Sequence, residues 1–146
     1  MANKESSIAY ENLNRRIFPG AGEYGIPRLE AETFDGNCEF VGFNYARGNC
    51  RNPEKKAVHF FIDDYQFDAL WRNVDRYVDK LRQFQYVLTP DFSTYTDFPK
   101  AIQIYNHYRK HWVGAYLQEY GCQVIPTISW STPESYAWCF DGEPKG

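Results

Sequence analysis

The pattern of apolar and polar positions makes the second part of the chain regular. Near-continuous apolar runs, typical of strands that are covered on both faces, alternate with segments whose apolar residues recur every three or four positions, as in amphipathic helices. The predicted strands are 57–62, 86–89 and 123–129. The predicted helices are 64–83, 97–120 and 134–140.

The order of these elements predicts an α/β fold with a three-strand parallel βαβαβα core. Each connection is long enough for the right-handed crossover that parallel strands require. The pattern leaves open whether the sheet is a partial barrel or an open sheet. Glycine and proline punctuate residues 1–56, so we expect an irregular Gly-rich N-terminal region, with a short helix over 6–16 and a short strand or extended segment over 39–45. We expect a single domain over 1–146, with its core over 57–146.

Charge and composition narrow the range of functions. The 146 residues carry a net charge of −3, so no overall positive field attracts nucleic acid, and strong direct binding of nucleic acid is not expected. Basic residues on the helix over 64–83 are interspersed with aspartates, as on a solvated helix face. Aromatic residues make up 18% of the chain. Such rings specify a core, and any that stay exposed favour contact surfaces.

The sequence gives no indication of a membrane or secreted protein. No apolar run approaches the roughly 18 residues that are needed to span a bilayer, and residues 1–10 lack the apolar stretch of a signal peptide. We therefore expect a cytoplasmic protein whose four cysteines are reduced thiols, with a Cys38–Cys50 disulfide as the alternative. The cysteine spacings match no zinc-finger or zinc-ribbon pattern.

Acidic, hydroxyl and aromatic residues follow the predicted strands, at the carboxyl ends where parallel α/β folds bind their ligands. If the strands are parallel, one edge of the sheet carries Asp63, Asp64, Tyr65, Asp91, Phe92, Ser93, Trp130 and Ser131. Asn106 and Arg109, on the helix over 97–120, are placed to reach over the same edge. Two interpretations stay open: these residues cap helices and shape loops, or they contact a ligand or partner. Trp130 is likewise either a lid on the core or an exposed anchor.

The aspartates raise the question of a metal ion. Asp63, Asp64 and Asp91 offer the oxygen ligands that Mg²⁺ or Mn²⁺ prefers, although no cofactor is firmly indicated. Clustered carboxylates repel one another unless a cation or a proton lies between them. No Gly-x-Ser-x-Gly elbow is present, which disfavours a serine hydrolase of that type.

Two histidines form a second pattern that metal sites also use. His107 and His111 lie four positions apart, the spacing of two ligands on one face of a helix. The three residues between them include two cations and no glutamate, so the pattern differs from that of a zinc protease. We expect these histidines to have a structural role.

Three segments of the chain together resemble one family: VHFFIDDYQFDALW at 58–71, the stretch at 86–130 that begins YVLTPDFSTYTDFP, and SYAWCFDGEPKG at 135–146. This is the domain-of-unknown-function family 4417, found in phages, mobile elements and bacteria, and the resemblance covers most of residues 24–146. Its members tend to be longer, and they often have a Gly-Asp pair where this chain has Ser131 followed by Thr132. The resemblance implies the fold and the genomic setting of a shortened member, without a mechanism.

Two functional hypotheses follow from these observations. The first is a small phage or mobile-element protein that acts by protein binding, with a host or defence component as its partner. The small size, acidic charge and abundant aromatic residues support it. The alternative is a metal-dependent hydrolase with an acidic site at the carboxyl ends of the strands. Whether the chain is an enzyme stays open at this point.

Overall fold

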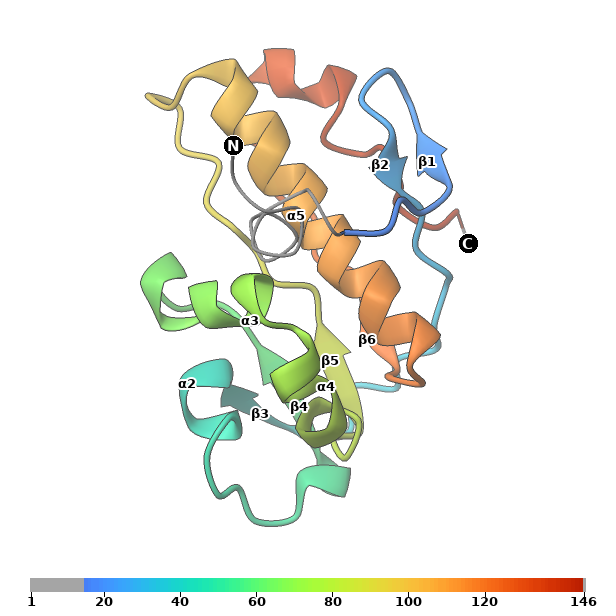
Figure 1. Ribbon diagram of the computed structural model, residues 1–146, viewed down its shortest axis with the longest axis vertical. Coiled ribbons are helices and arrows are strands. Elements are labelled where there is room, and N and C mark those ends of the chain that lie inside the picture. Colours follow the sequence, from blue (N-terminus) through green and yellow to red (C-terminus); the bar gives the residue numbers. More distant parts are fainter. Residues whose placement is uncertain (1–14, 146) are drawn as a thin grey trace, which may run out of the picture.

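The centre of the molecule is a four-stranded parallel sheet (Figure 1), in a computed structural model that describes residues 15–145. The strands lie side by side in chain order, as β3 (Glu39–Gly42), β4 (Lys56–His59), β5 (Tyr86–Leu88) and β6 (Val124–Ile125). The α/β fold and the parallel pairing of the three predicted strands are therefore confirmed. The extended segment predicted over 39–45 supplies a fourth strand at one edge, and the sheet does not close into a barrel.

Two of the strands are shorter than their apolar runs predicted. The first ends at His59 instead of residue 62, and beyond it the amide of Phe61 donates to the side-chain Nδ1 of His59 at 3.2 Å. The last ends at Ile125, because the following Pro126 has no N–H to continue the ladder. Beyond it, Thr127 N donates to the side-chain Oγ1 of Thr89 at 2.8 Å, so side chains replace the backbone ladder there.

The helix predicted over 64–83 is three shorter pieces. They are η2 (Asp64–Gln66), α3 (Asp68–Arg72) and α4 (Asp75–Leu81). The chain breaks at Asn73, whose φ of −149° and ψ of 71° are not helical. The apolar side chains on either side of the break, Trp71 and Val78, are both buried.

The long second helix is close to its prediction. It is α5 (Lys100–Glu119), and it begins after Pro99 instead of at residue 97. Gly121 follows its end with a φ of +92°, the left-handed conformation in which glycine commonly ends a helix. The predicted last helix is a 3-10 helix, η3 (Pro133–Ala137), with Pro133 at its start as expected.

The two faces of the sheet are covered differently. One valine from each of the four strands packs in the main core between the sheet and the helices: Val41, Val58, Val87 and Val124. On the opposite face Ala57, Tyr86 and Leu88 form a smaller cluster. Phe34 packs edge-on against Tyr86, with ring centroids 4.9 Å apart. The larger hydrophobic core therefore lies between the sheet and the helices.

The region before the first predicted strand has more structure than expected. A short antiparallel hairpin, β1 (Gly20–Ala21) with β2 (Ile26–Pro27), packs beside α5. The helix α2 (Phe43–Ala46) and the 3-10 helix η1 (Pro53–Lys55) lie between β3 and β4. The helix predicted over 6–16 lies almost entirely outside the described residues.

Two further expectations concern the whole chain. All four cysteines are free thiols, so the alternative Cys38–Cys50 disulfide is not formed. Among the described helices, none combines the length and the apolar character that crossing a bilayer requires.

Candidate functional site

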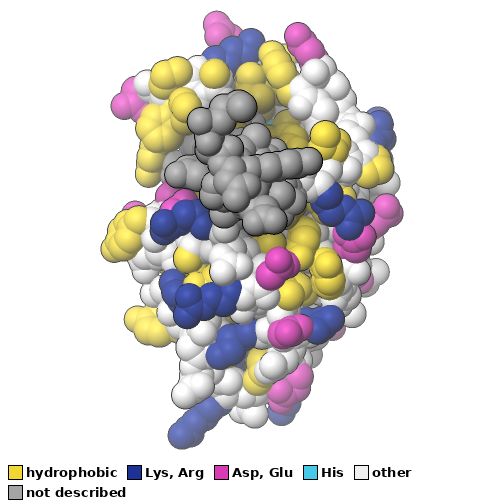
Figure 2. All heavy atoms as spheres, in the orientation of Figure 1, with side chains coloured by type: hydrophobic (Ala, Val, Ile, Leu, Met, Phe, Trp, Pro, Cys, Tyr) yellow, Lys and Arg dark blue, Asp and Glu magenta, His cyan; other side chains and the backbone are white. Residues whose placement is uncertain are grey.

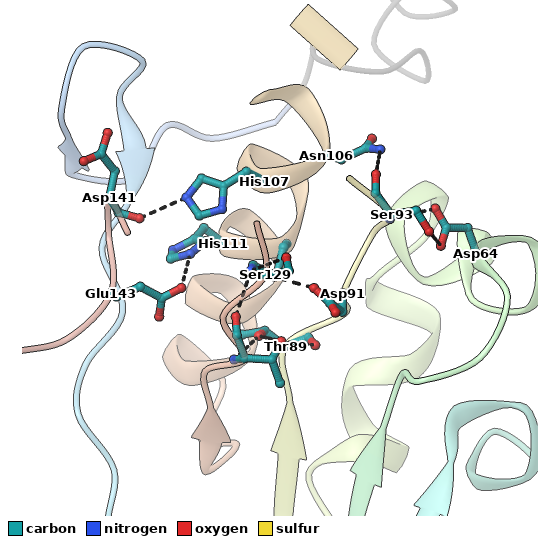
Figure 3. Close-up of polar contacts among 12 residues, drawn as sticks. Asp64, Thr89, Asp91, Ser93, Asn106, His107, His111, Ser129, Asp141 and Glu143 are labelled. Carbon is teal, nitrogen blue, oxygen red and sulfur yellow. Dashed lines mark hydrogen bonds and ion pairs between the residues drawn. The ribbon is translucent and has the colours of Figure 1, made fainter. Parts of the chain in front are cut away.

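The side chains of α5 reach over the carboxyl ends of the strands and divide that edge into three polar groups (Figure 3). In the view of Figure 3, Asp64, Ser93 and Asn106 lie to the right, and Thr89, Asp91 and Ser129 lie in the centre. The histidines and the C-terminal segment lie to the left. Four of the predicted residues, Asp64, Asp91, Ser93 and Asn106, therefore lie near one edge, in separate groups with different partners.

The first group, the Asp64 cluster, consists of Asp64, Ser93, Asn106 and Arg109. Asp64 accepts hydrogen bonds from the backbone N of Ser93 at 3.0 Å and from its Oγ at 2.8 Å. Asn106 Nδ2 donates to the backbone O of Ser93 at 2.6 Å, and Arg109 Nη2 donates to Asn106 Oδ1 at 2.5 Å. These short bonds tie η2, the segment after β5 and α5 together.

Phe92, next to this cluster, belongs to the core. Its side chain is only 2% exposed, and its ring lies 5.1 Å from that of Phe67. The Arg109 guanidinium lies 3.9 Å from the centre of the Phe92 ring, a cation–π contact. Phe92 therefore supports Arg109 from inside the protein and offers no free surface for stacking on a ligand.

The second group, the Lys110 cluster, consists of Lys110, Thr127, Ser129, Asp91 and Thr89. Lys110 is 1% exposed, and its Nζ donates to the backbone O of Thr127 at 2.8 Å. Ser129 Oγ lies 3.4 Å from the same Nζ, and Asp91 Oδ1 lies 3.8 Å from it. Thr89 and Thr127 join their hydroxyls at 2.9 Å. A buried cationic side chain thus lies at the centre of the edge.

Burial lowers the pKa of Lys110, because desolvation disfavours the ammonium form. The negative charges of Asp91, Glu143 and Cys139 act in the opposite direction but do not cancel this effect. Lys110 is the residue of this edge that sequence reasoning did not select. A signal was present, because Lys110 lies on the buried stripe of α5 at the spacing of Asn106 and Val113.

The third group connects α5 to the C-terminal segment. His107 Nε2 lies 3.1 Å from the backbone O of Asp141, and His111 lies 2.9 Å from both Pro27 O and Glu143 Oε1. Burial, reinforced by the neighbouring His111 and Lys110, lowers the pKa of His107 to about 3. The two rings are 4.4 Å apart, and their nitrogens hold the hairpin and the C-terminal segment in place.

The three aspartates proposed for a metal do not come together. Asp64 binds Ser93, and Asp91 lies beside Lys110. Asp63 is exposed, and its side chain makes no cap bond to η2. Among residues 15–145, no group of three or more His, Cys, Asp or Glu side chains has an arrangement that could hold a metal ion.

The remaining candidates lie at the surface. Tyr65 is 78% exposed and Trp130 is 55% exposed, so the interpretation of Trp130 as a buried lid on the core is wrong. Ser131 donates from its Oγ to Gln103 Oε1 at 2.5 Å, which joins the segment after β6 to the first turns of α5. Asp64, Ser93, Asn106 and Ser131 are therefore bonded within the protein, and the aromatic candidates Tyr65 and Trp130 are exposed.

Comparison with known proteins gives a family and no solved structure. The family model described as "Domain of unknown function (DUF4417)" matches residues 18–146. The Gene 1 protein of Mycobacterium phage L5 is 50% identical over 139 residues, which cover 94% of this chain and 60% of that protein. The Gene 1 protein of Mycobacterium phage D29 is 40% identical over 144 residues, which cover 94% of this chain and 51% of that protein. The chain thus spans between half and two thirds of the length of these relatives. No solved structure gives a significant match.

Proposed function

Because the chain belongs to the DUF4417 family and the two relatives described above are phage proteins, we propose that it acts by binding a protein. The partner that we propose is a host or defence protein of the bacterial cytoplasm. The support comes from one surface, which we call the aromatic end. It consists of Tyr95, Ile102, Trp130, Tyr136 and Phe140.

Each side chain of the aromatic end is large, apolar and well exposed. Trp130 and Tyr95 are 55% and 58% exposed, and the other three are between 44% and 50% exposed. Figure 2 shows hydrophobic side chains gathered at the top of the molecule, which in Figure 1 is the N-terminal end of α5 beside η3. Gathered apolar side chains of this kind mark contact surfaces, because each loses water when a partner covers it.

Contacts inside the protein hold this surface in place. The bond from Ser131 to Gln103 fixes the segment of Trp130 against the start of α5, where Ile102 lies. The rings of Tyr136 and Phe140 lie 5.9 Å apart on and after η3. A surface that is already ordered loses little conformational entropy when it binds.

The observation that carries the proposal is the contrast between this surface and the carboxyl edge. At the edge, Asp64, Ser93 and Asn106 form hydrogen bonds with one another or with Arg109. Among the described residues, the exposed side chains of the aromatic end form no comparable network of hydrogen bonds. The charged residues around it, Asp97, Lys100 and Glu134, are exposed and of mixed sign, which suits a protein partner better than a phosphate backbone.

The experiment is affinity capture from a mycobacterial lysate, chosen because the relatives come from mycobacteriophages. The chain is used as wild type, as a double variant with Trp130→Ser and Tyr136→Ser, and as Tyr120→Ser. Tyr120 is 43% exposed and follows the opposite end of α5, so it is the matched control. We expect wild type and Tyr120→Ser to retain the same discrete protein and the double variant to lose it.

The melting temperature separates binding from folding. Surface substitutions usually change stability by no more than about 0.5 kcal/mol, so all three proteins should melt together. Equal recovery of the partner by the double variant, or recovery of the same background by all three proteins, would contradict the proposal.

A further inference from the structure

Ser129 and Lys110 meet at the carboxyl end of β6 in an arrangement that protein binding does not require. The hydroxyl Oγ of Ser129 and the amine Nζ of Lys110 are 3.4 Å apart. Ser129 is partly exposed, whereas Lys110 is 1% exposed. A serine that water can reach, next to an amine that water cannot reach, is the arrangement that a nucleophile and its general base need.

The amine is oriented from the other side. Nζ donates to the backbone O of Thr127 at 2.8 Å, and Thr127 is itself held by the side chain of Thr89, through bonds of 2.8 and 2.9 Å. Asp91 Oδ1 lies 3.8 Å from Nζ. A neutral amine has two hydrogens and one lone pair. With one hydrogen donated to Thr127 O, the lone pair of a neutral amine can face the hydroxyl of Ser129, 3.4 Å away.

The contacts of Lys110 Nζ are longer on average than the hydrogen bonds of the Asp64 cluster. There the side-chain bonds measure between 2.5 and 3.0 Å. Among the contacts of Lys110 Nζ only the bond to Thr127 O is that short, and Asp91 Oδ1 is buried with no hydrogen-bond partner among the described residues. Catalytic hydrogen bonds are often long in the free protein and tighten when a substrate binds. A purely structural lysine is expected to satisfy the carboxylate beside it.

We propose that Ser129 is the nucleophile of an acyl-transfer site in which Lys110 is the general base. The substrate class is an ester or another activated acyl compound. The Ser129 hydroxyl gives its proton to the Lys110 amine as Oγ bonds to the acyl carbon. The bond to the leaving group then breaks, and the Lys110 ammonium returns a proton to that group. Water, deprotonated by the same amine, cleaves the acyl-serine and regenerates both residues.

The surroundings of Lys110 are compatible with this role. Desolvation lowers its pKa, so the neutral amine forms at a lower pH than for a lysine in water. The titratable and charged groups around it lie on the segment after β5, on α5 and on the C-terminal segment: Asp91, His107, His111, Cys139 and Glu143. This site is independent of the aromatic end, so either proposal can fail alone.

A fluorophosphonate probe, which forms a stable bond with an activated serine, tests the site. The full chain is treated with the probe, its intact mass is followed with time, and the modified residue is located by peptide mapping. We expect one adduct on Ser129, none in Ser129→Ala, and labelling slowed roughly 100-fold in Lys110→Met, the size of a typical general-base effect. Thr132→Ala is the nearby control, since Thr132 is exposed and its side chain makes no cap bond to η3, and it should be labelled like wild type.

The pH dependence of labelling in the wild type keeps the test decisive if Lys110→Met does not fold. The rate should rise with pH through a single ionisation and then level off, because the base must be neutral. A flat profile, the absence of an adduct, an adduct on another residue, or wild-type labelling of a folded Lys110→Met would each overturn the proposal.

Discussion

The carboxyl edge and the aromatic end both contain residues of types that often have a function. At the edge these side chains bind one another, whereas at the aromatic end they stay exposed. At the edge, the carboxylates, hydroxyls and amides lie close enough to bind one another, as Asp64 and Ser93 do. At the aromatic end, the rings of Trp130 and Tyr136 stay at least half exposed. Polar residues near a strand end are therefore weak evidence for a ligand until their partners are known. Exposed rings that pack against little are stronger evidence for a contact surface.

Of the substitutions that test this comparison, Lys110→Ala is expected to lower the free energy of unfolding most. It removes the donor to Thr127 O and leaves a cavity, and large-to-small changes at buried positions cost roughly 2–5 kcal/mol. The matched change at the aromatic end, Tyr136→Ala, should change stability by no more than about 0.5 kcal/mol. Urea unfolding of both variants measures the difference. Equal losses would show that the two regions do not differ in the way described.

The next effect comes from His107, whose pKa is lowered to about 3 in the folded protein. Below its ordinary pKa the unfolded chain binds a proton at this residue and the folded chain does not. Stability from this source is therefore complete above about pH 6.5 and is lost as the pH falls toward 3, by up to roughly 1.4 kcal/mol for each pH unit. Between pH 7.5 and 5 the expected loss is about 2 kcal/mol. His107→Gln should lack this part of the pH slope, and an unchanged slope in that variant would contradict the assignment.

A smaller effect is expected at the Asp64 cluster. Asp64→Ala leaves the backbone N and the hydroxyl of Ser93 without their acceptor, which should cost about 1–2 kcal/mol. Asp63→Ala is the neighbouring control, because Asp63 is exposed and forms no cap bond, and it should be close to neutral. Thermal melting of the two variants side by side measures the effect. If both variants melt at the same temperature, Asp64 does not hold the edge together.

The smallest effect is expected from divalent ions. Millimolar Mg²⁺ or Mn²⁺ should leave the melting temperature unchanged, because the Lys110 amine already lies beside Asp91 and the three aspartates do not converge. A binding metal would raise the melting temperature by mass action. A clear rise that Asp91→Asn abolishes would restore the metal-dependent hydrolase as the better hypothesis.

The sequence predicts the larger elements well and their details less well. Apolar periodicity places β4, β5 and α5, since burial of one stripe or run is a local property of the chain. The break at Asn73 is not predictable in the same way, because the apolar spacing continues across it and only the backbone angles of Asn73 show the interruption. Pro126, which has no N–H for the ladder, explains the early end of β6 and is visible in the sequence.

The candidate site is likewise predictable in part. The strand order places Asp64, Asp91 and Ser93 near one edge, and that much follows from parallel pairing. Which of them form hydrogen bonds with each other depends on distances of a few ångströms. The spacing of residues in the sequence does not determine such distances. Lys110 was overlooked because a lysine on a helix is usually solvated, although its position on the buried stripe of α5 was readable.

The most direct measurement for the central claim, that the aromatic end is the binding surface, is site-specific photo-crosslinking. A benzoylphenylalanine at position 136, in place of Tyr136, and one at position 120, in place of Tyr120, compare the two ends of α5 in the same mycobacterial lysate. The account predicts a discrete crosslinked protein from position 136 and none from position 120. The same crosslinks from both positions, or a discrete product from position 120 alone, would contradict it.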